Sequence, residues 1–396
     1  MMDKSSLGVY QSTLSKILEN NERFKPQHVK NVLVLHEEML NHIGDWAIGF
    51  DKLKYLKTFM QNAAITINFT ADGAGKIYDA LLKNNPHLDA VTSRPWSEID
   101  FEKYDLVFTY SYNEPPILAW LHERYGRLIQ SEQYKVCVYT LSHGLIRADP
   151  NAIPVFPVNQ EFFDHAKNSK VPPELYISNE EQQWANEWLR ENGLKESEQL
   201  FIVLDGTHRD KLLSMQVYIQ FLMHLLKREN IKLLIFDENN MGKDKFYREL
   251  IGARLMDKFI FCKGLSLRQA FCLLGSSYTR LVFGPCTGLM HCASGIYDNY
   301  LNNGLEREKL PVLITYTGKY HPDAKTVHWW WSNAPLVNVL ALRMRNNQKT
   351  MLLLEELEDV EKKTNSGLLC KEYTISMLTE FIDKKLPYKF TETKVA

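Results

Sequence analysis

Short apolar strands alternate with amphipathic helices along most of the 396-residue chain, and this alternation constrains the fold more than any other feature. Apolar runs rich in Val, Ile, Leu and Phe are typical of strands that are buried on both faces of a sheet. Their order with helices favours a parallel, doubly wound α/β sheet. The predicted strands are residues 31–35, 64–69, 89–91, 104–110, 135–140, 200–206, 232–237, 258–264, 280–285 and 311–318.

The alternation stops once, between residues 146 and 175, where five prolines occur without a clear period. We expect a loop and linker there, and a domain boundary near residue 170. Ligands of such sheets bind at the carboxyl ends of the strands, so we expect the site in a cleft between two domains. The predicted organisation is an N-terminal domain over 1–170 with an extension over 1–30, a C-terminal domain over 171–370, and a helix and tail over 371–396 that packs back on the N-terminal domain.

Composition excludes some classes of function. Lys and Arg number 47 against 48 Asp and Glu, so bulk charge does not indicate a nucleic-acid partner. The six cysteines show no C-x-x-C spacing and most lie in apolar surroundings, which favours reduced thiols in a cytosolic protein. The sequence shows neither a signal peptide's apolar run nor the roughly 20 apolar residues of a membrane span, so we expect peripheral membrane contact at most.

The first candidate for chemistry follows the first strand, at His42-Ile43-Gly44-Asp45. Gly44 permits a tight backbone path. A carboxylate at the carboxyl end of this strand would face the cleft and could accept a proton from an attacking hydroxyl group. Alternatively, Asp45 caps a helix that begins at Trp46, because Asp favours that position.

The second candidate follows the strand that ends at Gly206 and Thr207. His208, Arg209 and Lys211 come next, so hydroxyl, guanidinium and ammonium groups gather where phosphate oxygens could be bound. The spacing is not that of a P-loop. A solvated polar loop before a helix would have the same composition.

The third candidate is GPCTGLMHCASGIYD, residues 284–298. Thr287 and Gly288 stand where a helix begins, and the first amides of a helix lack internal partners and lie at its positive end. This arrangement can hold an anion without a metal ion, and His291 could donate to a phosphate or sugar oxygen. Alternatively, Thr287 is an ordinary helix cap and His291 is a histidine of the core.

Other cofactors find little support. No Asp-x-Asp occurs and no His or Cys cluster has zinc spacing, so no metal site is predicted. No Gly-x-Gly-x-x-Gly follows the strand at 31–35 or the strand at 200–206, so no nicotinamide site is predicted. The tryptophans of HWWW (328–331) could stack on a base or a sugar, or form a rim packed between domains.

With the three candidates in this order, the sequence resembles glycosyltransferase family 9, the ADP-heptose:lipopolysaccharide heptosyltransferases of the GT-B fold. The resemblance covers about residues 31–318. Within 43–91, a Gly-Asp pair starts the first helix, an Ile-Thr strand follows, and an Asn-Pro turn ends the second helix. GTHRDK (206–211) resembles the family's phosphate-binding loop, and CTGLMHCAS (286–294) resembles its DTGxxHxAA segment.

The resemblance implies two facing Rossmann-like domains and a role for each matched residue. Asp45 matches the proposed catalytic base, and Thr207 and Lys211 match contacts to the donor phosphate. Cys286 stands where the family has an aspartate that is implicated in holding the donor sugar. The matching diphosphate-binding residues are Thr287, Gly288, Leu289, Met290 and His291, and further donor or acceptor contacts are expected at Gly44, Gly206, His208, Arg209 and Cys286.

We therefore expect an inverting, metal-independent glycosyltransferase that needs no cofactor. It would move a sugar from a nucleotide-diphosphate donor, with ADP-heptose favoured by the resemblance, to a saccharide or lipid-linked acceptor. It would act in the cytoplasm, peripherally at the inner membrane face. Two other interpretations stay open: a GT-B relative with other chemistry, such as a nucleotide-sugar epimerase, and a non-catalytic nucleotide-binding protein whose site has decayed at Cys286.

Overall fold

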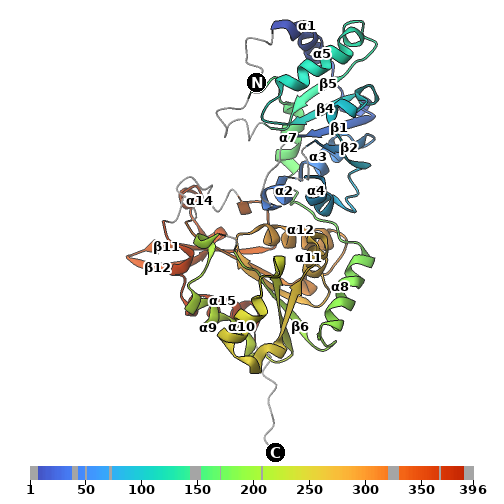
Figure 1. Ribbon diagram of the computed structural model, residues 1–396. Helices are drawn as coiled ribbons and strands as arrows, with labels where there is room; N and C mark the ends of the chain where they lie inside the picture. Colours follow the sequence, from blue (N-terminus) through green and yellow to red (C-terminus); the bar gives the residue numbers. More distant parts are fainter. Residues whose placement is uncertain are drawn as a thin grey trace, which may run out of the picture. The chain divides into compact units, whose positions relative to one another are not determined.

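The computed structural model describes residues 8–37, 43–49, 51–70, 74–142, 153–169, 171–206, 208–319, 330–364 and 367–387. The chain forms two compact units, each built of a sheet and helices (Figure 1). Unit 1 comprises the chain up to Asn41 together with Gly49–Val171. Unit 2 comprises His42–Ile48 and the chain from Pro172 onward. A short segment near the N-terminus therefore belongs, by its contacts, to the second unit.

Unit 1 is a parallel sheet in the order β3-β2-β1-β4-β5 among its described residues. Sequential strands neighbour one another on each side of β1, as in a doubly wound sheet. The strands are β1 (Asn31–His36), β2 (Ala64–Phe69), β3 (Ala90–Ser93), β4 (Leu106–Tyr110) and β5 (Cys137–Thr140). The helices are α1 (Gln11–Glu22), α3 (Asp51–Phe59), α4 (Ala74–Leu82), α5 (Pro115–Gln130) and α7 (Gln160–Ser169).

The start of α5 holds part of the proline-rich stretch through a buried carboxylate. Glu114, fully buried, accepts hydrogen bonds from the Thr109 hydroxyl and from the amides of Val155 and Phe156. This carboxylate ties the segment after residue 152 to the amino end of α5. The prediction of a loop over all of 146–175 is wrong for 160–169, which form α7, because the prolines flank this helix and leave its interior free.

Unit 2 is a sheet in the order β12-β11-β10-β9-β6-β7-β8. Its pairs are parallel except for β12, which is antiparallel to β11. The strands are β6 (Gln199–Val203), β7 (Ile231–Asp237), β8 (Phe259–Lys263), β9 (Thr279–Pro285), β10 (Val312–Thr317), β11 (Val337–Arg345) and β12 (Gln348–Leu353). The helices are α2 (Ile43–Gly49), α8 (Asn179–Glu191), α9 (Met215–Leu226), α10 (Lys243–Ile251), α11 (Leu267–Leu274), α12 (Gly288–Asn302), α14 (Asp359–Lys362) and α15 (Ile375–Lys385).

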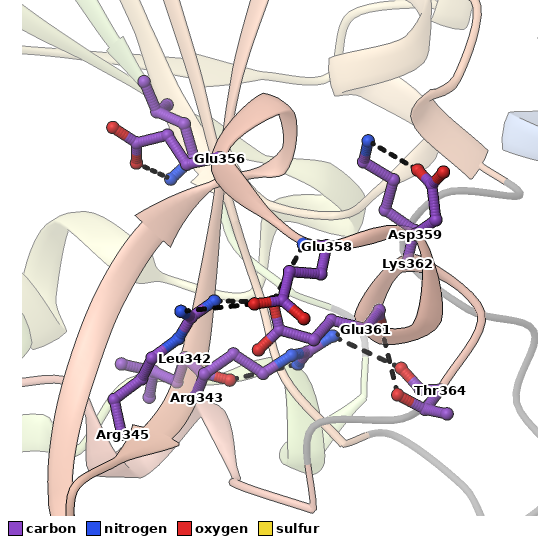
Figure 2. A network of polar contacts seen from close by, with 10 residues as sticks. Leu342, Arg343, Arg345, Glu356, Glu358, Asp359, Glu361, Lys362 and Thr364 are labelled. Atoms are coloured by element: carbon purple, nitrogen blue, oxygen red, sulfur yellow. Dashed lines mark hydrogen bonds and ion pairs between the residues drawn. The ribbon is translucent and has the colours of Figure 1, made fainter.

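The β11–β12 hairpin is a feature that the sequence analysis does not predict. Asn346 and Asn347 connect its strands with φ angles of 51° and 62°, the left-handed pair that a tight hairpin turn requires. The buried Arg343 donates to the carbonyls of Glu361 and Thr364, and Arg345 pairs with the Glu361 carboxylate at 2.6 Å (Figure 2). These bonds fasten the hairpin to α14.

The last helix packs within unit 2. Leu378 and Ile382 of α15 belong to the core that also contains α9, and α9, α10 and α15 lie side by side (Figure 1). Asp383 accepts hydrogen bonds from Arg228 at 2.7 Å and pairs with His224 at 2.9 Å. These contacts place the helix in the core of unit 2, and the expectation that it packs back on the N-terminal domain stays a prediction. No described helix is long and apolar enough to cross a membrane.

Candidate functional site

The site is built on two neighbouring strands of unit 2, β6 and β9, whose carboxyl ends meet at one edge of the sheet. The Leu204 amide donates to the Phe283 carbonyl at 2.8 Å, so the contact continues beyond β6. A methyl group added at Gly284 would lie 2.6 Å from the Leu204 Cβ. Only glycine therefore fits here, and its absent side chain lets the two following loops approach each other.

Lys211 joins these two loops. Its Nζ donates to the Cys286 carbonyl at 2.8 Å, which directs the ammonium group toward the segment that leads into α12. His208 and Arg209 have largely exposed side chains, and His208 accepts a hydrogen bond from the Asp210 amide. Gly206 lies close to Lys211 and Pro285, and Thr207 lies outside the described residues. The loop thus brings one of its cations to the helix start.

Thr287 precedes α12 in an extended conformation, but its side chain makes no capping bond. The buried Thr287 hydroxyl oxygen has no hydrogen-bond partner in the described structure. The Thr287 carbonyl accepts from the amides of Met290 and His291, so the amides of Gly288 and Leu289 lead the helix. Met290 is fully buried and its side chain belongs to the core. Thr287 therefore occupies the N-cap position, as the alternative interpretation has it, but its side chain does not cap the helix.

The segment with Asp45 packs against this helix start. A methyl group on Gly288 would lie 2.9 Å from the Gly44 nitrogen, and one on Gly44 would lie 3.2 Å from the Gly288 Cα. The helix α2 begins at Ile43, so Asp45 stands inside its first turn and does not cap a helix that begins at Trp46. The two glycines allow close backbone contact within unit 2. Gly288 is thus required by packing inside the chain as well as by any ligand.

His291 lies in the first turns of α12 and is 8% exposed. Its ring stacks on Trp331 with centroids 3.9 Å apart and an interplanar angle of 18°. The Cys286 Sγ is 3.9 Å from its Nε2. Burial, helped by the charge of Lys211, lowers the pKa of His291 to about 3, so the imidazole is neutral at neutral pH. The tryptophan motif therefore contributes a partner for His291, while His328 and Trp329 lie outside the described residues.

A second polar group at the same edge was missed by the sequence analysis. Asp205 accepts from Lys243 at 2.8 Å and from the Tyr218 hydroxyl at 3.2 Å, and Lys243 also pairs with Glu238. Burial disfavours the charged form of Lys243, but these carboxylates outweigh it and raise its pKa. Asp205 directly precedes Gly206 in the sequence, and this position was the available signal. Within the described ranges, no three His, Cys or acidic residues gather as metal ligands.

Comparisons with known proteins agree with the architecture. No protein-family model matches the sequence, and no curated protein matches it. Among solved structures, the chain is similar to E. coli ADP-heptose lipopolysaccharide heptosyltransferase II, with a TM-score of 0.54, 14% identity, and coverage of 90% of this chain and 98% of that one. It is also similar to a glycosyl transferase of family 9 from Veillonella parvula, with a TM-score of 0.54, 15% identity, and coverage of 80% and 87%.

At these identities the likeness concerns the fold. It confirms the predicted GT-B architecture of two Rossmann-like domains and confirms the resemblance to family 9 at the level of the fold. The roles of the individual residues stay predictions.

Proposed function

We propose that the chain is an inverting glycosyltransferase that transfers a sugar from a nucleotide-diphosphate donor to a saccharide or lipid-linked acceptor, with Asp45 as the base. The fold supports this proposal, because the two similar structures described above are named as a heptosyltransferase and a glycosyl transferase. Fold alone does not specify chemistry, so the proposal depends on the site.

One observation carries the proposal: Gly44 and Gly288 are in backbone contact. This contact holds the turn with Asp45 against the amino end of α12. Lys211 is bonded to the carbonyl of Cys286, two residues before Gly288. The segments that carry Asp45, Lys211 and the leading amides of α12 therefore adjoin one another in unit 2. A carboxylate, a cation and helix amides are the groups that base catalysis beside a bound diphosphate needs, and this supports the proposal.

In the proposed reaction, Asp45 accepts the proton of the acceptor hydroxyl as its oxygen forms a bond to the anomeric carbon. The bond between that carbon and the diphosphate oxygen breaks on the opposite face, and the electron pair leaves with the diphosphate. Lys211 and the amides of Gly288 and Leu289 stabilise the negative charge that develops there, without a metal ion. The oxocarbenium-like transition state resembles that of glycoside hydrolysis.

The proposed donor is ADP-heptose, because that sugar nucleotide appears in the name of the E. coli protein of similar fold. The enzyme would then act in the cytoplasm, on an acceptor held at the inner membrane face. Cys286 bears on the sugar, since a thiol cannot accept a sugar hydroxyl's hydrogen bond as strongly as a carboxylate can.

Two variants test the roles separately. Asp45→Asn should reduce turnover by about 10²–10⁴-fold and leave ADP affinity unchanged, because a general base acts in the chemical step. Lys211→Met should weaken ADP binding by roughly 10-fold or more, because it removes a charge-assisted contact. The matched control is Lys227→Met, an exposed lysine just after α9 that should leave both quantities unchanged. Titration calorimetry with ADP and a transfer assay with ADP-heptose measure the two effects.

Other outcomes would replace the proposal. Undiminished turnover of Asp45→Asn would remove Asp45 as the base. Release of free sugar without an acceptor would favour epimerase-like chemistry. Binding of ADP with no consumption of any nucleotide sugar would identify a non-catalytic nucleotide-binding protein.

A further inference from the structure

The His291 ring is held on three sides within unit 2. One face stacks on the Trp331 indole at 3.9 Å, and Nε2 lies 3.9 Å from the Cys286 sulfur. The Cδ2 edge lies beside Gly44, where an added methyl group would be 3.2 Å away. These contacts involve the face and two of the ring atoms. Of the two ring nitrogens, the contacts with described residues leave Nδ1 for a ligand.

The charges around the ring favour its neutral form. Burial is the main cause of the low pKa of His291, and the Lys211 cation adds to it. Titratable groups on the neighbouring segments include the Cys286 thiol and the Asp45 carboxylate, which belongs to the same helical turn as Gly44. The helix α12 itself also carries Cys292 and Asp298. A neutral imidazole carries one N–H donor and one acceptor, and the partner of one nitrogen decides which is which.

We propose that Cys286 and Trp331 are positioning residues that hold His291 as a neutral imidazole with its proton on Nδ1, and that this N–H donates to an oxygen of the bound diphosphate. The Cys286 thiol donates to Nε2, which places the ring proton on Nδ1. The hydrogen bond from Nδ1–H to the diphosphate is the second part of this inference, and it rests on the proposed function. The assignment of the tautomer does not.

Trp331 is suited to this role by the way it is buried. The side chain is 2% exposed, and its Nε1 has no hydrogen-bond partner in the described part of the chain. A buried, unpaired N–H lowers stability. A hydrogen bond from Nε1 therefore does not explain why an indole occupies this position. The Trp331 indole stacks on the His291 ring. Phenylalanine would keep an aromatic face and remove the unpaired N–H, whereas leucine would remove the stack.

Cys286 sets the direction of the hydrogen bond. A thiol can donate a hydrogen bond, whereas an ionised carboxylate only accepts one. With aspartate at position 286, His291 would have to donate from Nε2, and a negative charge beside the ring would favour the imidazolium form. Cys286→Asp should therefore reverse the tautomer or charge the ring, and Cys286→Ala should leave the ring neutral without selecting a tautomer.

The experiment uses ¹⁵N-imidazole NMR of the full chain, with His291→Gln to assign the signal. We expect wild type to show a neutral Nδ1–H tautomer that does not titrate between about pH 5.5 and 8. Trp331→Phe should keep this signature with an equal or higher melting temperature, whereas Trp331→Leu should show His291 titrating closer to its ordinary pKa. A wild-type ring that titrates near pH 6.5, or that carries its proton on Nε2, would overturn the inference.

Adding ADP tests the second part. The Nδ1–H resonance should shift on binding, and ADP affinity should be retained in Trp331→Phe and fall at least about 3-fold in Trp331→Leu, near the lower end of what one hydrogen bond contributes. Binding without any change at Nδ1 would overturn the donation to the diphosphate. No ADP binding at all would overturn the proposed function together with this second part, while the tautomer measured without ligand would stand.

Discussion

The carboxyl edges of the two sheets differ in chemistry although their topology is alike. Each edge has a buried histidine: His36 ends β1 in unit 1, and His291 lies in the first turns of α12 in unit 2. In unit 1 the histidine is surrounded by the rings of Phe69, Tyr78 and Tyr110. In unit 2 it has a thiol and an indole as neighbours and a lysine nearby.

The two units fill the space at the carboxyl edges of their sheets in different ways. The His36 ring stacks on Tyr110 at 4.7 Å and Phe69 stacks on Tyr78 at 4.4 Å, so large rings close the edge of unit 1. The edge of unit 2 instead has Gly284 and Gly288, whose missing side chains admit neighbouring backbone. In unit 2, Lys211 is bonded beside the start of α12, whereas in unit 1 Lys52 lies over the Tyr110 ring with its Nζ 5.6 Å from the ring centroid. The helix amides and the cation lie together in unit 2, which is the reason to propose the donor site there.

The largest expected effect tests whether the aromatic edge of unit 1 is core. Phe69→Ala should lower the free energy of unfolding by about 3–5 kcal/mol, because Phe69 is 1% exposed and stacked on Tyr78. ADP affinity should be unchanged, because every residue assigned to the donor lies in unit 2. Urea denaturation and calorimetry measure the two quantities.

The control for this prediction is Phe246→Ala in unit 2, where the ring is 44% exposed and the cost should stay below about 2 kcal/mol. Loss of ADP binding in a folded Phe69→Ala protein would mean that the aromatic edge of unit 1 also serves the nucleotide.

The second effect tests the contact between Gly44 and Gly288, which brings the segment with Asp45 to the proposed donor site. Gly288→Ala should cost about 1–3 kcal/mol of stability, because its methyl group would lie 2.9 Å from the Gly44 nitrogen and backbone must move. ADP binding should weaken as well, since the leading amides shift. Gly49→Ala is the matched control: it lies in α2, meets nothing within 4 Å, and should be neutral or stabilising.

Equal stability of the Gly288→Ala and Gly49→Ala proteins would show that α2 does not pack closely against the start of α12 in solution. The assignment of Asp45 to the site would then lose its main support.

The sequence predicted the parts of the molecule that depend on local order. Strand runs and helix periods are local properties, and the carboxyl ends of parallel strands share an edge, so the positions of the loops that contain Gly206 and Thr287 could be predicted from the order of the strands. The interpretation of Asp45 as a helix cap used only the residues next to it in the sequence. It is wrong because the helix begins earlier, at Ile43, and because tertiary contact recruits this segment to unit 2.

The features that the sequence could not predict depend on distant partners. From the sequence, Gly288 was explained only by the close approach of a ligand. The residues next to it in the sequence do not reveal that the Gly44 backbone packs on it. The stack of Trp331 on His291 is likewise a contact between residues far apart in the chain. The turn at Asn346-Asn347 did carry a local signal, since asparagine tolerates positive φ, but the strands beside it lack a simple alternation of apolar and polar residues.

The smallest expected effect compares the two histidines directly. Burial, with Lys52 as a further cause, lowers the pKa of His36 to about 3, as burial and Lys211 do for His291. An unfolded histidine titrates near pH 6.5, so between pH 6.5 and 3 the unfolded chain binds a proton that the folded chain does not. Stability should therefore fall as the pH falls below 6.5, and each histidine should contribute about 1.4 kcal/mol of this loss by pH 5.5.

Carboxylates also titrate in acid, so the measurement is a difference between proteins. Urea denaturation at pH 7.5 and 5.5 gives the fall in the free energy of unfolding between these two pH values. This fall should be smaller in His36→Gln and in His291→Gln than in wild type, by about 1.4 kcal/mol each. The His36→Gln protein keeps His291, and the His291→Gln protein keeps His36. If ADP binds beside His291 and not beside His36, saturating ADP should change the fall in unfolding free energy between pH 7.5 and 5.5 in the His36→Gln protein. In the His291→Gln protein this fall should stay closer to its value without ligand. Equal responses of the two variants to ADP would contradict the assignment of the nucleotide to unit 2 alone, because the two edges would then be linked to the ligand in the same way.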